Sequence, residues 1–135
     1  MNIKKLLLSV SSMILLLGMS YNAMSHHSFV GQFDPEKSTA LTGTVVGVRW
    51  VNPHAFFVIE VTNDDGTSEN WSFELGSPNT LIRYGWSRDT LKIGDLITAD
   101  GYLARSGEKL ANAKIVILAD GTVFQAASSY EPDAE

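Results

Sequence analysis

The order of the β-patterned segments constrains the fold of this chain more than any other feature. Runs rich in β-branched and aromatic residues alternate with short breaks that contain Gly, Asp or Pro. Such runs predict strands, and such breaks predict the turns between them. A single helix is expected after the third run, because Ser77 can cap it, Pro78 suits its first position and Gly85 can end it. The expected strands are residues 41–50, 55–62, 67–75, 91–103, 110–118 and 122–124.

Three strands, a short helix, two strands and a short extra strand is the order of an OB fold. The sequence therefore predicts an all-β protein, a small OB-like barrel of five to six strands with one short helix between strands 3 and 4. Gly43 and Gly47 suit this fold, because the first strand of such a barrel must bulge or coil. A plain β-sandwich would also accommodate six strands, but it gives no reason for a helix at that position.

The domain boundaries follow from composition. Residues 26–127 are expected to form the barrel domain, and residues 26–38 are a polar arm within it. Phe29 and Phe33 are the large apolar residues of this arm, and we expect them to pin it to the barrel. Residues 128–135 are acidic and contain a proline, which predicts a flexible tail.

Residues 1–25 have the layout of a secretory signal peptide. Lys4 and Lys5 precede an apolar run at residues 6–17, and small residues follow near Ala23 and Ser25. The apolar run is too short to cross a bilayer. The absence of cysteine from the chain fits a bacterial periplasm better than a disulfide-built secreted scaffold. We expect Sec-type export to the periplasm or the medium, with no stable membrane anchor after processing.

The cleavage position has three alternatives. A cut after Ser25 makes His26 the first residue and places Ala23 at the −3 position. A cut after Ala23 leaves Met24 at the front and places the larger Tyr21 at −3, which is less favourable. The third alternative is an uncleaved anchor, for which the apolar run is short.

Charge and cysteine content exclude several classes of function. The whole chain carries a formal charge of −5, and removal of residues 1–25 takes away two of the ten basic residues and none of the fifteen acidic ones, which leaves −7. Such a charge opposes nucleic-acid binding. Because the chain has no thiol, disulfides, thiolate metal sites and a cysteine nucleophile are also excluded.

The three histidines, His26, His27 and His54, are the candidate metal ligands. With a cut after Ser25, the new amino group and the Nδ1 atom of His26 can chelate one ion, as in a histidine brace. With the other cut, His26 stands third, as in amino-terminal copper and nickel motifs. A set of nitrogen ligands suits copper or zinc. In the alternative interpretation, His26 and His27 are polar residues of a mobile arm and His54 caps a turn.

Aromatic side chains suggest a different type of site. OB barrels bind ligands across the faces of their second and third strands, where aromatic residues can stack. The excess of acidic residues makes a neutral ligand, such as an oligosaccharide, electrostatically easier to bind than a polyanion. The candidate ligand-binding residues are Trp50, Asn52, Trp71 and Trp86.

The acidic residues are less informative. Glu60 and Glu74 fall on predicted outer strand faces, so we expect them to be solvated. No pair of carboxylates can be placed at a distance suited to acid–base catalysis. No serine has the surroundings of a nucleophile.

Several motifs together resemble one family of small exported bacterial proteins, catalogued as domain of unknown function 6152. The residues that carry the resemblance are His26-His27-Ser28-Phe29, Phe33-Asp34, residues 41–45, Trp50 with Asn52-Pro53-His54, Trp71, residues 81–85 with Trp86, and Gly94-Asp95. The resemblance implies an exported single domain with an OB-like or related barrel and no established activity. It places the His-His pair and the Asn-Pro-His segment among the family's defining features.

The sequence thus supports three hypotheses. The first is a non-enzymatic periplasmic protein that binds a divalent metal ion, copper, through His26, His27 and His54, as a carrier or as an accessory to an envelope metalloenzyme. The second is a binding module for a small neutral ligand or an envelope protein. The third, a copper-dependent oxidase, ranks last, because the chain is small for an enzyme that must also shape a substrate cleft.

Overall fold

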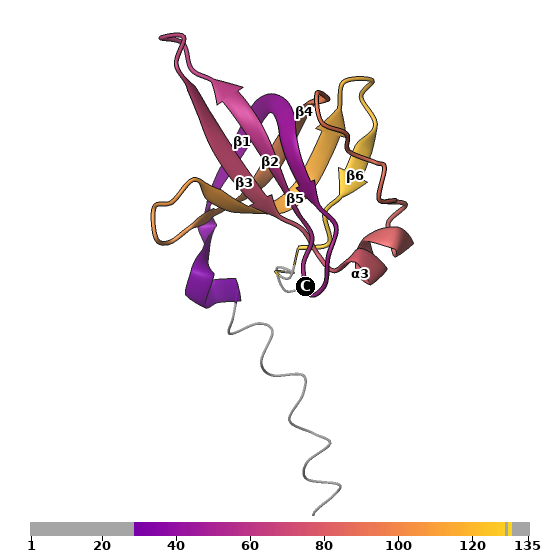
Figure 1. Ribbon diagram of the computed structural model, residues 1–135. Helices are drawn as coiled ribbons and strands as arrows, with labels where there is room; N and C mark the ends of the chain where they lie inside the picture. Colours follow the sequence, from indigo (N-terminus) through magenta and orange to yellow (C-terminus); the bar gives the residue numbers. More distant parts are fainter. Residues whose placement is uncertain (1–28, 129, 131–135) are drawn as a thin grey trace, which may run out of the picture.

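The computed structural model describes residues 29–128 and 130, and they form one β-barrel with a short helix at its side (Figure 1). Residues 29–32 form a helical turn that leads into the first strand. The elements that follow are β1 (Phe33–Arg49), β2 (Phe56–Thr62), β3 (Ser68–Glu74), α3 (Pro78–Arg83), β4 (Leu96–Ala104), β5 (Leu110–Leu118) and β6 (Val123–Gln125). Among the described residues, no helix is long and apolar enough to cross a membrane.

The sheet closes on itself. Its strands are ordered β3-β2-β1-β4-β5-β6, and β3 also pairs with β5 in parallel, which joins the two ends of the sheet. All other neighbouring strands are antiparallel. This connectivity, with α3 between β3 and β4, confirms the predicted all-β, OB-like barrel.

β1 is longer than the sequence predicted. Residues 33–38 were expected to belong to an arm, but they form the first third of β1, and Phe33 and Ser38 pair with Ala104 and Tyr102 of β4. These residues are mostly polar because this part of the strand is largely exposed, so they lack the apolar pattern that marks a strand. The arm prediction was therefore wrong for this segment.

The fourth strand begins later than predicted. Residues 91–95 were assigned to it, but they form a turn in which the Lys92 amide donates to Asp95 Oδ2 at 2.8 Å. Gly94 has a φ of +96°, which an extended strand does not contain. The strand starts at Leu96, where pairing with Thr44 begins.

The predicted bends of β1 are present. The register with β2 shifts between Val45 and Gly47, which marks a bulge. At Gly43 a Cβ atom would lie 2.5 Å from the carbonyl oxygen of Glu60, so only glycine allows the backbones to approach this closely.

The helix α3 forms where the sequence predicted it. Ser77 Oγ accepts a hydrogen bond from the Thr80 amide, Pro78 opens the helix, and Gly85 follows with a φ of +85°. Leu81 is fully buried and holds the helix against the barrel.

Two apolar clusters hold the structure together. The main one fills the barrel and includes Phe57 and Phe73, whose rings stack with centroids 5.1 Å apart. The second consists of Phe29, Phe33 and Ala104 with Tyr102, Leu110 and Tyr130. Phe29 and Phe33 are 3% and 1% exposed, which confirms that they pin the start of the domain to the barrel.

Candidate functional site

The candidate site lies on the seam where β3 and β5 run in parallel. Glu74 and Asn112 are Cα partners across this seam. Their neighbours Phe73 and Ala111 are fully buried in the core, so strand alternation directs Glu74 and Asn112 to the outer surface. Nevertheless only 6% of Glu74 and 1% of Asn112 is exposed, and these two residues are the buried polar residues of the described chain.

A segment that follows β6 covers this outer surface; we call its described residues, 126–128 and 130, the strap. The Ala126 amide donates to the Lys114 carbonyl, and the Gly76 amide donates to the Ala126 carbonyl, each at 2.9 Å. Ser128 Oγ donates to Asn112 Oδ1 at 2.6 Å. The strap therefore lies over the seam and satisfies the amide oxygen of Asn112, whereas the partners of Glu74 are His54 and Asn112.

The strap fits closely. A Cβ atom at Gly76 would lie 2.6 Å from both the Cβ and the carbonyl oxygen of Ala127, so this position requires glycine. Ala127 itself has a φ of +51°, a left-handed conformation that is unfavourable for alanine. Gly76 thus allows the strap to lie against the segment that follows β3.

His54 reaches the same seam from the loop between β1 and β2. The Ala55 amide donates to the Gly76 carbonyl at 3.1 Å, and the Leu75 amide donates to the Ala55 carbonyl at 2.8 Å, so the end of this loop is fixed to the segment after β3. The Nδ1 atom of His54 lies 2.6 Å from Glu74 Oε1. The His54 side chain is 42% exposed, whereas that of Glu74 is 8% exposed, so the imidazole lies between the buried carboxylate and solvent.

The electrostatics of Glu74 reflect its burial. Desolvation raises the pKa of Glu74 above its ordinary value of 4.5, while His54 and the hydrogen bond from Asn112 oppose this shift. A buried carboxylate requires such partners, because an unpaired buried charge is strongly unfavourable. The Glu74 carboxylate accepts from Nδ1 of His54 and thereby favours the orientation and tautomer in which Nε2 carries a lone pair. Nε2 makes no hydrogen bond with any described residue.

A cavity of about 240 Å³ adjoins these side chains. Ser77 and Thr80 of its lining belong to the start of α3, the helix that Figure 1 shows beside the barrel. The polar side chains of the cavity come from three separate parts of the chain, which converge only in the fold. The lining residues are His54, Glu74, Leu75, Gly76, Ser77, Thr80, Asn112 and Ala127.

The burial of Glu74 differs from the expectation that this residue is solvated. Alternation assigned it to the correct face of β3, but the prediction that it is solvated was wrong, because the strap covers that face. Glu60, predicted in the same way, is exposed on β2. One sequence signal for this site does exist: Asn112 is an amide flanked by alanines within an apolar strand.

Among the predicted metal ligands, only His54 can be placed. His26 and His27 lie outside the described residues. Within the described chain there is no group of three or more His, Asp or Glu side chains that could hold a metal ion, so His54 and Glu74 do not form a complete site by themselves.

The start of the described chain nevertheless lies close to the seam. The Phe29 ring lies 5.6 Å from the Tyr102 ring and stacks on Tyr130 of the strap at 5.0 Å. Tyr102 is the Cα partner of Asn112. Phe29 is therefore anchored one strand away from the Glu74–Asn112 pair.

The predicted ligand-binding residues do not gather at one place that the structure identifies. Trp50 is half-buried against the core, and Asn52 is exposed in the loop before His54. Trp86 is 4% exposed, and its indole donates to the Gln125 carbonyl at 2.7 Å.

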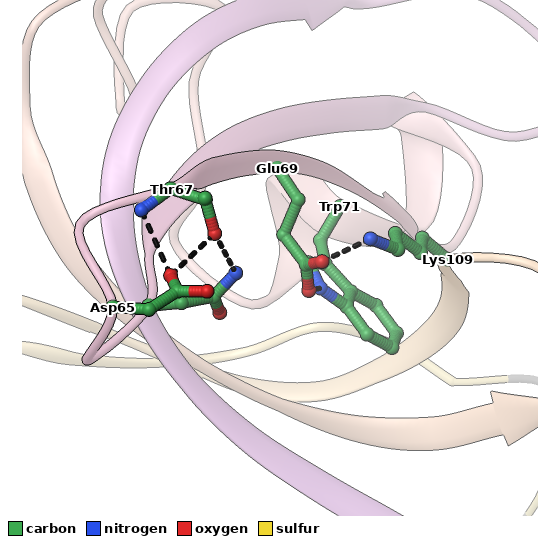
Figure 2. Close-up of polar contacts among 6 residues, drawn as sticks. Asp65, Thr67, Glu69, Trp71 and Lys109 are labelled. Carbon is green, nitrogen blue, oxygen red and sulfur yellow. Dashed lines mark hydrogen bonds and ion pairs between the residues drawn. The ribbon is translucent and has the colours of Figure 1, made fainter.

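Trp71 belongs to a polar network on β3 (Figure 2). Its indole donates to Glu69 Oε1 at 2.7 Å, and Lys109, from the turn between β4 and β5, pairs with the same carboxylate. These contacts lower the pKa of Glu69, with the Lys109 hydrogen bond as the first cause. Asp65 and Thr67 bond each other in the adjacent turn, which completes a network that shapes the hairpin between β2 and β3.

Comparison with known proteins identifies a family. The sequences described as "Family of unknown function (DUF6152)" match residues 14–113, which is most of the chain and includes His54, Glu74 and Asn112. No curated protein and no solved structure matches significantly.

Proposed function

This chain belongs to the DUF6152 family, whose function is unknown, and we propose from its own geometry that it is an exported protein that binds a divalent metal ion, copper. His54 supplies one imidazole ligand. His26 supplies an imidazole and, after cleavage behind Ser25, its amino group. His27 is a further ligand or a hydrogen-bonding neighbour of the site.

One observation carries this proposal: the 2.6 Å contact between His54 Nδ1 and Glu74 Oε1. Histidines that bind metals generally donate their other ring N–H to a carboxylate or a carbonyl, which fixes the ring and raises its basicity. Here the carboxylate is buried and the imidazole is partly exposed. This arrangement suits Nε2 for coordination of an ion from the solvent side.

The length of the chain allows the N-terminal histidines to reach this site. Tyr102, Asn112 and Glu74 are successive Cα partners on three strands, so about 10 Å separates the first from the last. Phe29 is fixed at Tyr102, and the three residues from Phe29 back to His26 span up to about 10 Å. The agreement of these two lengths supports a site that His54 shares with the N-terminal histidines.

The ligand types favour copper. The proposed set consists of nitrogen atoms, and the chain has no cysteine that would select softer metals or clusters. Among divalent first-row metals, nitrogen sites bind copper most tightly. An exported protein also meets metal ions outside the cytoplasm, which is consistent with a signal peptide at residues 1–25 and release into the periplasm.

A carrier or accessory role has more support than catalysis. The cavity beside His54 is about 240 Å³, which is small for a substrate cleft. The alternative of a neutral ligand stacked on tryptophan has less support, because Trp86 is buried and the indoles of both Trp71 and Trp86 bond within the barrel.

The proposal is tested by competition titration of Cu(II) against a chelator of known affinity. The protein is purified after export, and mass spectrometry establishes its N-terminus. Glu74→Gln is expected to weaken Cu(II) binding by about 10- to 100-fold, the range for loss of a carboxylate that supports a metal-bound histidine, and His54→Ala, which removes a ligand, by at least as much. Glu60→Gln, an exposed glutamate on β2, serves as the matched control and should bind like the wild type. Wild-type affinity in His54→Ala would refute the proposal.

A further inference from the structure

A second hollow lies on the outer face of β1, β2 and β3. It is an open groove of about 580 Å³, a volume typical of sites for small molecules. Its lining is mostly apolar, with one cation and one hydroxyl. The lining residues are Gly47, Val48, Arg49, Phe56, Val58 and Ser72.

Gly47 forms the floor of this groove. It is the Cα partner of Val58, at the bulge of β1. A Cβ atom at Gly47 would contact Val58 at 3.8 Å, an ordinary van der Waals distance, so packing does not require glycine here. The missing side chain instead leaves open space above Val58.

Arg49 and Phe56 form one wall. They are Cα partners, and the Arg49 guanidinium lies over the Phe56 ring, 5.0 Å from its centroid. This cation–π contact holds the guanidinium at the edge of the apolar surface.

Arg49 forms no ion pair with any described carboxylate, whereas Arg105 pairs with Asp34. Arg49, Phe56 and Glu74 are paired in turn across β1, β2 and β3. The Glu74 carboxylate, however, is already bonded to His54. The five donors of the guanidinium are therefore available to a ligand in a protein that otherwise carries an excess of acid.

We propose that this groove binds a small organic anion that has one carboxylate and an aromatic or aliphatic body. The carboxylate pairs with Arg49, and the body lies over Phe56 and Val58 in the space that Gly47 leaves open. The net negative charge of the protein opposes a polyanion, but a single carboxylate that meets a guanidinium is well matched. This ligand differs from the neutral one that composition suggested, and the site does not depend on a bound metal.

The test uses 2-naphthoate as the probe and 2-naphthylmethanol as its neutral counterpart. Titration of the metal-free, exported protein is followed by amide chemical shifts in NMR spectra. Naphthoate should shift the amides of Gly47, Val58 and Ser72 in a saturable manner, and the alcohol should bind at least about tenfold more weakly, since it lacks the charge-assisted hydrogen bond.

Two variants separate the groove from the rest of the surface. Arg49→Met should weaken naphthoate binding at least about tenfold, and Gly47→Val should abolish it by filling the floor. Arg88→Met removes an exposed arginine outside the groove and should change nothing. The proposal is overturned if the two probes bind equally, if Arg49→Met binds like the wild type, or if the shifts map elsewhere.

Discussion

The imidazole of His54 is held by the carboxylate of Glu74, with Nδ1 and Oε1 2.6 Å apart. This contact connects a loop between two strands to the seam that closes the barrel. The carboxylate is buried because the strap covers it, and its remaining partner is Asn112. The orientation of His54 therefore depends on residues from the loop, from β3, from β5 and from the strap.

The raised pKa of Glu74 predicts a specific dependence of stability on pH. A higher pKa in the folded state means that the folded protein binds the proton more tightly than the unfolded chain. This contribution to stability is fully present below 4.5, the ordinary value, and is lost as the pH rises through the folded-state pKa. Glu74→Gln lacks this titration. As the pH rises from 4.5 through the folded-state pKa, the free energy of unfolding of Glu74→Gln should therefore increase relative to that of the wild type. Urea unfolding at a series of pH values measures the difference, and a difference that stays constant or falls would contradict the assignment.

Asn112→Ala should destabilise the protein by about 1–3 kcal/mol, because Ser128 and the buried Glu74 each lose a hydrogen-bond partner. Asn70→Ala, at an exposed position of β3, is the control and should change the free energy of unfolding by less than about 0.5 kcal/mol. Equal effects of the two substitutions in urea unfolding would show that the seam does not depend on Asn112.

Gly76→Ala should displace the strap. The added Cβ would lie 2.6 Å from two atoms of Ala127, so we expect a loss of about 1–3 kcal/mol and faster hydrogen exchange of the amides of Gly76 and Ala126. At Gly31 a Cβ would meet no atom within 4 Å, and Gly31→Ala should be neutral or slightly stabilising in the helical turn. Unchanged exchange in Gly76→Ala would contradict the close fit of the strap.

Phe29→Ala should weaken both stability and metal binding. Loss of a buried phenylalanine costs about 3 kcal/mol, and it also releases the anchor that holds the N-terminal histidines near the seam. Phe124→Ala, at a half-buried ring packed on Trp86, should lower stability but leave the Cu(II) affinity of the folded protein unchanged. If both variants bind Cu(II) like the wild type, the anchor has no role in binding.

Much of the fold could be predicted from the sequence because its signals are local. The β-branched runs, the Gly-containing turns and the Ser77–Pro78 helix start each depend on neighbouring residues, and the strand order followed from them. Residues 33–38 were not predicted as a strand, because they are extended through pairing with β4, which lies more than sixty residues away in the chain.

The candidate site could be predicted only in part. His54 was identified by residue type and by its position after a strand-ending Asn-Pro. Glu74 was missed because alternation along a strand reveals the face of a side chain but not what covers that face. The cover comes from Ser128 and its neighbours, more than fifty residues further along the chain, and no local pattern indicates it.

The most direct test of the central claim is electron spin-echo envelope modulation of the Cu(II)-loaded, correctly processed protein, which detects coordinated imidazoles through their remote nitrogens. We expect the number of equatorial imidazoles to fall by one in His54→Ala, whereas Glu60→Gln should retain the wild-type spectrum. An identical spectrum for His54→Ala and the wild type would show that His54 does not bind the metal ion.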